Sequence, residues 1–353
     1  MCRILFVGGG SIGHIAPAVA VWQEFLGAHP RAQAHFVCSE REDDSEFLRK
    51  EHLDWTAVRA PKLSWNFLWK FFLAYRDAAQ LIEQEKPDIL LSKGGYVSVP
   101  VCLAAHWRQI PIILHESDVV SGNANRFTAR WATAVCMGFQ PERDGGKHVY
   151  TGNPVRADAT SGSREEGLRI TGFSGTRPIL LVMGGSQGAE SLNRAVLQLL
   201  CEMQKSVDVI HITGRGKEGA NTQAGYWSRP FVREELKHLY AIADVALSRA
   251  GASSIGELAA NGIPGILVPL RGVGHDHQQK NAEYAANKGG CILLQQSALQ
   301  ENLLPLLERV AQDEGERLGL SERIRRLHQP DAAERICRVL EETLSKKQKG
   351  STL

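Results

Sequence analysis

The segment "RILFVGGGSIGHIAP", residues 3–17, indicates the fold class, because an apolar run leads directly into a glycine-rich turn and then into a helical pattern. Gly8, Gly10 and Gly13 have the G-x-G-x-x-G spacing of the loop between the first strand and helix of a dinucleotide-binding βαβ unit. Such a loop presents unpaired backbone N–H groups and the positive end of a helix dipole, which favour phosphate. The segment therefore predicts a parallel α/β sheet with a phosphate-binding loop at its carboxyl edge.

The same pattern returns in the second half of the chain, where "ILLVMGGSQGAESLN", residues 179–193, again places a glycine loop after an apolar run. A stretch rich in Gly, Pro, Ser and charge, residues 151–167, separates the two halves, and we place the boundary near residues 153–156. Residues 331–350 are expected to form a final helix. The remaining apolar runs that predict strands are residues 89–92, 110–114, 207–212, 245–248 and 265–269. The alternation predicts two doubly wound, Rossmann-like domains facing each other across a cleft.

Composition narrows the class of protein. The 353 residues are 43% hydrophobic and 23% charged, as expected for a globular protein of about two domains. A net charge of +2, without basic runs interleaved with aromatic residues, argues against a nucleic-acid partner. Seven scattered cysteines, none in C-x-x-C spacing, indicate a reducing compartment rather than disulfides or a zinc site. The apolar runs are too short for a signal peptide or for a membrane span of about 20 residues.

Two other hypotheses follow from these motifs. An NAD-dependent enzyme needs an acidic residue about 20 residues beyond the first loop, and Glu40 is available but late. The NAD hypothesis gives no role to His14, although a histidine in the first turn of a helix can simply cap the helix or pack against its neighbours. A metal site lacks support, because His275 and His277 have no further ligands at a known spacing and no strand ends in D-x-D. The segment "REDDS", residues 41–45, is expected to be a solvated loop.

A third loop, "SRAGASSIGELAANGIPGILVP" at residues 248–269, is more specific than the first two. Its small residues let a diphosphate approach a helix N-terminus, and the hydroxyls of Ser253 and Ser254 can donate to it. Glu257, about one turn into the helix, is suited to accept both hydroxyls of a ribose; the alternative is an ordinary surface glutamate. Further polar groups suited to sugar hydroxyls follow at Asp276, Gln278 and Gln279.

Taken together, the segments "GGSIGHIAP", "KGGYVSVP", "LHESDVVSGNANR", "GNPVR", "GGSQGAESLN" and "SRAGASSIGELAANGIPGILVP", the last followed by "DHQQKNAEYA", carry a resemblance. Their order and approximate spacing resemble the MurG family, the N-acetylglucosaminyltransferases of peptidoglycan synthesis, over nearly the whole chain. One departure is Ile12, which stands where the family's loop usually has another glycine.

The resemblance implies an α/β protein of the glycosyltransferase B fold. Residues 1–155, completed by a C-terminal helix at 331–353, would form the acceptor and membrane-associating domain, and residues 156–330 the UDP-GlcNAc domain. The implied reaction is an inverting transfer of GlcNAc to the muramyl 4-hydroxyl of undecaprenyl-diphospho-MurNAc-pentapeptide, with no metal and no other cofactor. The alternatives are a related UDP-GlcNAc transferase or epimerase with another acceptor, and a non-catalytic homologue that binds UDP-sugar or lipid.

The resemblance also implies roles for individual residues. His14 is the first candidate for the catalytic base, since a neutral imidazole accepts a proton near pH 7, with Asp118 as its rival and Glu116 as an orienting group. The implied donor-binding residues are Arg156, Ser186, Gln187, Phe231, Val232, Ala252, Ser253, Ser254, Glu257, Gln278 and Gln279. The implied acceptor-binding residues are Gly10, Ser11, Gly13, His14, Gly95, Tyr96, Ser98 and Asn125.

The segment "RAPKLSWNFLWKFFLAYR", residues 59–76, mixes aromatic residues with cations and contains no acid. It is either an ordinary core helix or a surface that docks on a membrane, where rings lie at the headgroup boundary and cations meet anionic lipid. Because the implied acceptor is linked to a lipid, we expect the protein to dock as a peripheral protein on the cytoplasmic face of the inner membrane. Other proteins of cell-wall synthesis are expected as further partners. The residues expected to contact lipid are Trp65, Leu68, Trp69, Lys70, Phe72 and Trp107.

Overall fold

The computed structural model describes residues 2–10, 12–59, 67–141, 145–185, 188–217, 221–272 and 276–350. The chain divides into two compact units, each built around its own sheet. The first unit comprises Met1–Pro154 together with Pro330–Leu353, and the second comprises Val155–Gln329.

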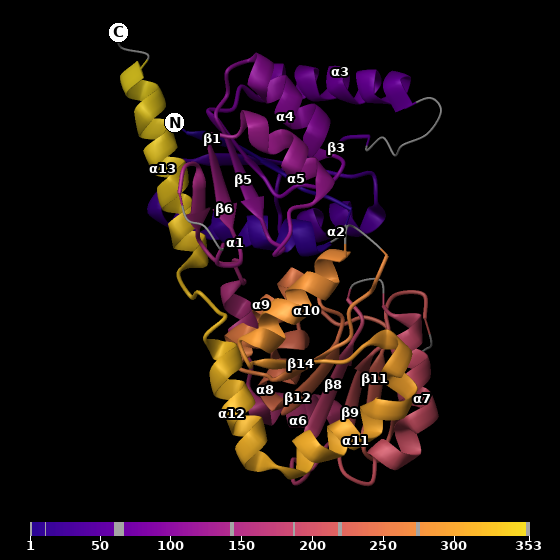
Figure 1. Ribbon diagram of the computed structural model, residues 1–353. Helices are drawn as coiled ribbons and strands as arrows, with labels where there is room; N and C mark the ends of the chain where they lie inside the picture. Colours follow the sequence, from indigo (N-terminus) through magenta and orange to yellow (C-terminus); the bar gives the residue numbers. More distant parts are fainter. Residues whose placement is uncertain are drawn as a thin grey trace. The chain divides into compact units, whose positions relative to one another are not determined.

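The first unit contains a parallel sheet whose seven described strands have the order β3-β2-β1-β4-β5-β6-β7 (Figure 1). The strands are β1 (Arg3–Val7), β2 (Gln33–Cys38), β3 (Trp55–Ala57), β4 (Ile89–Ser92), β5 (Ile112–Glu116), β6 (Ala134–Met137) and β7 (His148–Tyr150). The helices are α1 (Ile12–Ala28), α2 (Glu42–Lys50), α3 (Phe67–Glu85), α4 (Ser98–Trp107), α5 (Asn123–Thr128) and α13 (Ala332–Gly350), with a 3₁₀ turn at Ala129–Trp131.

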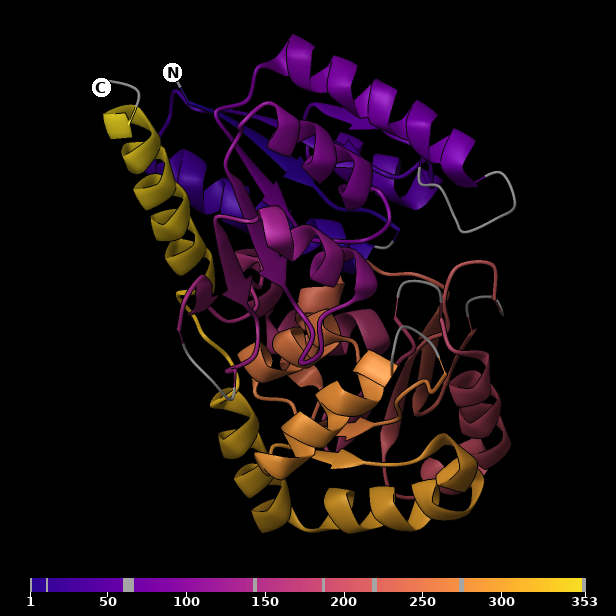
Figure 2. The same cartoon turned by 45° about the horizontal axis from the view of Figure 1, so that its top comes forward.

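Alternate residues of β1 show why this sheet is covered on both faces. Ile4 and Phe6 pack with residues of α1, α2 and α13, whereas Leu5 and Val7 pack with residues of α3 and α4. This is the period of two that a strand buried on both faces requires, and each fully buried side chain of this size contributes about 1.5–3 kcal/mol. The predicted C-terminal helix is confirmed as α13, which lies against α1 (Figure 2).

The second unit repeats the architecture, with its described strands in the order β10-β11-β9-β8-β12-β13-β14 and only the β10–β11 pair antiparallel. The strands are β8 (Ile179–Met183), β9 (Asp208–Ile212), β10 (Asn221–Gln223), β11 (Tyr226–Arg229), β12 (Val245–Ser248), β13 (Gly265–Leu267) and β14 (Cys291–Leu293). The α-helices are α6 (Arg164–Thr171), α7 (Glu190–Met203), α8 (Leu236–Ile242), α9 (Ala252–Asn261), α10 (His277–Asn287), α11 (Leu299–Gln312) and α12 (Glu314–Arg325), with 3₁₀ turns at Ala157–Thr160 and Gln296–Ala298. The prediction of two Rossmann-like sheets is confirmed.

One prediction about the first unit was wrong. The charged segment at residues 41–45 is not a solvated loop but the start of α2, whose first turn holds Glu42, Asp43 and Asp44. Acidic side chains stabilise a helix N-terminus through the helix dipole. Asp44 is completely buried, because its carboxylate accepts hydrogen bonds from the Gly10 N–H at 2.8 Å and from the Ser39 hydroxyl at 2.6 Å.

Candidate functional site

The first candidate site lies where the sheet order of the first unit reverses, at the carboxyl ends of β1 and β4. These strands are neighbours, and the Lys93 N–H continues their pairing by donating to the Val7 carbonyl at 2.7 Å. The loops that follow approach closely: a Cβ added at Gly95, whose φ is +82°, would lie 2.9 Å from the Gly9 carbonyl oxygen. Glycine is therefore required there. Such a switch point is where parallel α/β sheets bind ligands.

Side chains at the start of α2 make hydrogen bonds to the glycine loop after β1. Gly10 directs its N–H to the buried Asp44 carboxylate, and the Arg41 guanidinium donates to the Gly10 carbonyl at 2.8 Å. The loop is thereby fixed before any ligand arrives. Gly13 is partly exposed in the first turn of α1, while Ser11 and the side chain of Ile12 lie outside the described residues.

His14 follows this loop in the first turn of α1. Its side chain is partly exposed, and its Nδ1 atom is buried without a hydrogen-bond partner among the described residues. The pKa of His14 is lowered mainly by burial and next by the positive charge of Lys93. The carboxylates of Asp118 and Asp44 and a hydrogen bond to the Lys93 backbone act in the opposite direction. The net result favours a neutral imidazole, which is the form that accepts a proton.

Lys93 belongs to a buried polar cluster that sequence analysis did not identify. Its ammonium donates to the Ser117 hydroxyl at 2.7 Å and contacts Nδ1 of His115. Nε2 of His115 lies 3.1 Å from the Gly152 carbonyl oxygen. Because a carbonyl only accepts, Nε2 carries the proton and Nδ1 is the acceptor for Lys93. Burial lowers the pKa of Lys93 to about 7, while the charges of Glu116 and Asp118 oppose that effect.

Hydrogen bonds at the end of β5 and after it bring together Glu116, Asp118 and Asn125, three residues of the predicted acceptor half. Glu116 is buried, and burial raises its pKa. One of its carboxylate oxygens accepts from Asn125 Nδ2 at 2.9 Å and the other from the Asp118 N–H at 3.2 Å. Both oxygens of Glu116 therefore hold this loop, whereas the Asp118 carboxylate acts electrostatically on His14.

The other predicted acceptor residues lie on the loop between β4 and α4. Tyr96 is exposed beside Gly95 and is available to a ligand. Ser98 is buried, and its hydroxyl donates to the Gly95 carbonyl at 2.7 Å. Ser98 therefore shapes the loop in this structure.

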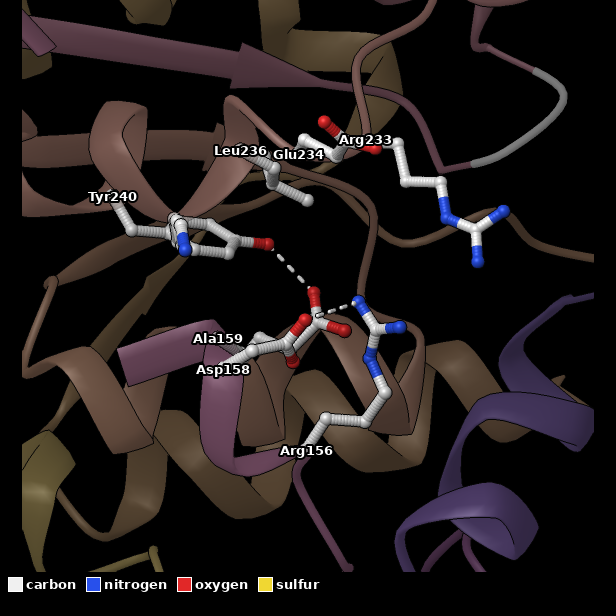
Figure 3. Close-up of a pocket in the computed structure, with 9 residues that line it drawn as sticks. Arg156, Asp158, Ala159, Arg233, Glu234, Leu236 and Tyr240 are labelled. Carbon is white, nitrogen blue, oxygen red and sulfur yellow. Dashed lines mark hydrogen bonds and ion pairs between the residues drawn. The ribbon is translucent and has the colours of Figure 1, made fainter. Parts of the chain in front are cut away.

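The second candidate site is a cavity of about 260 Å³ in the second unit (Figure 3). The Tyr240 hydroxyl donates to Oε2 of Glu257 at 2.6 Å, and the Arg156 guanidinium pairs with the Asp158 carboxylate at 3.3 Å. Burial raises the pKa of Glu257, whereas the Tyr240 hydrogen bond and the Arg156 charge lower it. Tyr240 was not predicted from the sequence. The residues lining the cavity are Arg156, Asp158, Ala159, Arg233, Glu234, Leu236, Lys237, Tyr240 and Glu257.

Glu257 reaches this cavity from α9, the helix of the third glycine loop. The helix starts at Ala252, which is buried, after Gly251 in an extended conformation, and Gly251 has no side chain that could cap it. Ser253 and Ser254 are partly exposed in its first turn. The helix thus combines a positive dipole end, two hydroxyls and a carboxylate within a few residues, a combination that can bind a nucleoside diphosphate.

Three of the remaining predicted donor residues, Gln278, Gln279 and Phe231, contact other side chains or backbone groups of the second unit. Gln278 accepts from the Leu270 N–H at 3.0 Å, and Gln279 donates to Glu283 at 3.0 Å. The Arg215 guanidinium lies 4.2 Å from the centre of the Phe231 ring, and the neighbouring Val232 is buried. Ser186 and Gln187 lie outside the described residues, as does His275. Within the described ranges, no three His, Cys, Asp or Glu side chains gather as metal ligands.

Comparison with known proteins gives concordant results for both units. The N-terminal domain of glycosyltransferase family 28 matches residues 4–137, and the C-terminal domain of that family matches residues 179–336. The chain is 35% identical over 358 residues to a protein of Lachnoclostridium phytofermentans, with 97% of this chain and 99% of the relative covered. That protein is named UDP-N-acetylglucosamine--N-acetylmuramyl-(pentapeptide) pyrophosphoryl-undecaprenol N-acetylglucosamine transferase.

Two solved structures show that the fold is shared more widely. The MurG structure of Acinetobacter baumannii superposes with a TM-score of 0.75 at 23% identity, covering 97% of this chain and 100% of that one. A UDP-GlcNAc 2-epimerase from Neisseria meningitidis, bound to UDP-GlcNAc, superposes with a TM-score of 0.66 at 15% identity, covering 96% and 100%. At these identities the two likenesses establish the fold alone.

Proposed function

The chain belongs to the MurG family within glycosyltransferase family 28, and we propose that it transfers GlcNAc from UDP-GlcNAc to the muramyl 4-hydroxyl of undecaprenyl-diphospho-MurNAc-pentapeptide. This is a step of peptidoglycan synthesis. The observation that carries the assignment is 35% identity over 97% of the chain to a transferase of that name.

In this proposal the second unit binds the donor. The N-terminus of α9, with Ser253 and Ser254, binds the diphosphate, and Glu257 accepts the ribose hydroxyls. Arg156 lines the same cavity and supplies positive charge near the departing diphosphate, so electrostatic stabilisation requires no metal. The GlcNAc hydroxyls meet Gln278 and Gln279. The uracil meets the backbone near Phe231 and Val232, while Ser186, Gln187 and Ala252 complete the donor site.

The first unit binds the acceptor and supplies the base. The loops after β1 and β4 meet at the sheet's switch point, which supports them as the site of the acceptor diphosphate. As the 4-hydroxyl attacks the anomeric carbon of GlcNAc, its proton passes to His14, the C–O bond to UDP breaks, and the anomeric configuration inverts. His14 is supported as the base because its surroundings favour the neutral imidazole. Asp118 remains the rival, because its carboxylate acts on the same ring.

Release of UDP tests this assignment against a non-catalytic homologue and against an epimerase. We expect purified protein to release UDP from UDP-GlcNAc rapidly only when a short-chain lipid-linked acceptor is present. An inactive homologue releases none under either condition. A UDP-GlcNAc epimerase changes the sugar without requiring the acceptor.

An exposed apolar patch on the first unit supports docking on a membrane. The patch comprises Leu68, Trp69 and Phe72 of α3, with exposed fractions of 82%, 65% and 54%. Trp107 at the end of α4 is also exposed, at 72%, but it lies toward the other end of α3, where the adjacent Arg108 pairs with Glu83 at 3.7 Å. The opposite face of α3 is buried through Ala74, Ala78, Leu81 and Ile82, so this helix is more than an ordinary core element. Monomers rarely leave such patches exposed without an interaction partner. Trp65 lies outside the described residues.

We propose that this patch docks the protein as a peripheral component on the cytoplasmic face of the membrane that carries the lipid-linked acceptor. Lys70 lies beside the patch and is exposed, in a position to meet anionic headgroups. None of the described helices combines the length and apolar character needed to cross a bilayer. Further contacts with proteins of cell-wall synthesis are part of the same proposal.

Sedimentation with anionic liposomes tests the patch. Trp69→Ala combined with Lys70→Glu is expected to weaken binding at least tenfold, because it removes a ring that would insert among the headgroups and reverses a charge worth roughly 1 kcal/mol at an anionic surface. Leu318→Ser on α12 is a control, since Leu318 is an exposed apolar residue, 63% exposed, that lies outside the patch, in the second unit. Equal binding by the folded patch variant and the wild type would place the docking surface elsewhere.

A further inference from the structure

Lys93 occupies an unusual place for a lysine. It follows β4 directly, at the switch point of the first sheet, and only 2% of it is exposed. A Cβ added at Gly8 would lie 3.2 Å from Cβ of Lys93 and 2.9 Å from the His14 carbonyl oxygen, so Lys93 and the first turn of α1 flank the same glycine. Burying an ammonium is unfavourable unless it is compensated, so its retention beside the glycine loop calls for a role.

The surroundings fix the ammonium in one position. Ser117 accepts one of its hydrogen bonds at 2.7 Å, and Nδ1 of His115 accepts a second. His115 is itself fixed by its Nε2–H donating to the Gly152 carbonyl. This chain of hydrogen bonds joins β4, β5 and the segment after β7, so the charge has little freedom to move.

We propose that Lys93 is a positioning residue for the acceptor half of the reaction: its ammonium, held by His115 and Ser117 next to the first turn of α1, keeps His14 in the form that accepts the acceptor's proton. The inference rests on the proposed function, because the neutral imidazole matters only if His14 accepts the acceptor's proton. A like charge disfavours protonation of a neighbouring base. Lys93 thus offsets the carboxylates that favour the imidazolium.

The charges around the pair agree with this role. The carboxylates of Asp118, after β5, and Asp44, on α2, act on His14 in the opposite direction to Lys93. Lys93 also faces Glu116 and Asp118, whose negative charges favour its ammonium, and the thiol of Cys136 on β6. Because the pKa of Lys93 is about 7, the ammonium is largely charged over the acidic range in which a histidine titrates.

The experiment measures the titration of His14 and the activity separately. Protein with ¹³C-labelled histidine is titrated by NMR, and the His14 signal is assigned by its loss in His14→Gln. In Lys93→Met the midpoint of the His14 titration is expected to rise by about one pH unit, as for removal of a nearby like charge. The acid limb of kcat/KM for the acceptor is expected to rise with it, so that activity at pH 6 falls several-fold relative to activity at pH 8.

Two further variants make the outcome interpretable. Ser117→Ala removes one hydrogen bond but keeps the charge, so its His14 titration is expected to stay close to that of the wild type. Lys93→Gln removes the charge but keeps a donor, and it replaces Lys93→Met if the latter does not fold. A merely structural role for Lys93 predicts a uniform loss of activity at every pH.

An unchanged His14 titration in the folded, uncharged variant overturns the inference, whatever the activity. A raised titration together with a raised acid limb supports it. A raised titration without movement of the acid limb supports the electrostatic effect of Lys93 but overturns His14 as the base, so the two failures are distinguishable.

Discussion

Replacing His14 by alanine is expected to lower turnover by a factor on the order of 10²–10⁴, the usual loss when a general base is removed. The affinity for UDP-GlcNAc should stay unchanged, because His14 belongs to the first unit and the proposed donor site lies in the second. Steady-state kinetics with a short-chain lipid-linked acceptor measure the first quantity, and calorimetric titration with UDP-GlcNAc measures the second.

Asp118→Asn is the comparison that decides between the two candidate bases. Asparagine preserves the size of the side chain, so a large loss of turnover here reports the carboxylate itself. If Asp118→Asn loses far more activity than His14→Ala, Asp118 is the base and His14 supports it. Because Asp118 acts electrostatically on the His14 ring, a smaller loss is expected even when His14 is the base.

The Glu257→Ala substitution is expected to weaken UDP-GlcNAc binding by something on the order of 1.5–3 kcal/mol, or roughly 10- to 150-fold, as for loss of a hydrogen bond to a charged group. Its carboxylate lines the cavity of the second unit and receives the Tyr240 hydroxyl at 2.6 Å. Both features indicate a carboxylate held in position rather than an ordinary surface glutamate. Calorimetry with UDP-GlcNAc and with UDP measures the loss.

Glu234→Ala is a matched control for this experiment. Glu234 lines the same cavity but is exposed, so its removal also takes a carboxylate from the cavity without touching the proposed ribose contact. We expect Glu234→Ala to bind UDP-GlcNAc nearly as tightly as the wild type, so that nearly all of the loss in affinity is specific to Glu257→Ala. Equal affinities for Glu257→Ala and the wild type would remove Glu257 from the donor site.

Patterns that depend on local sequence predicted much of the fold. The apolar runs at residues 89–92, 179–183 and 245–248 correspond to β4, β8 and β12 without change of bounds. Short strands such as β3 and β7 were not predicted, because three residues with partly exposed side chains carry little periodic signal. Their strand conformation comes from pairing with β2 and β6.

Charged residues were harder to place than apolar ones. Asp44 and Lys93 are both buried, although Asp and Lys side chains are seldom buried without partners. Their partners, the Gly10 N–H and His115, are 34 and 22 residues away in the sequence. Tyr240 was missed for the same reason, because its contact with Glu257 depends on the packing of α8 against α9. Glu257 and His14 stand next to glycine loops in the sequence, so both could be named as candidates, and their roles stay predictions.

Direct analysis of the reaction product tests the central claim. The protein is incubated with UDP-GlcNAc labelled with ¹³C in the sugar and with a short-chain lipid-linked muramyl-pentapeptide acceptor, and the products are examined by NMR. We expect a lipid-linked disaccharide with a β-1,4 bond from the labelled GlcNAc to the muramyl residue, formed in equal amount with UDP. Label that appears in an epimerised UDP-sugar, or that remains in UDP-GlcNAc while the acceptor is unchanged, would contradict it.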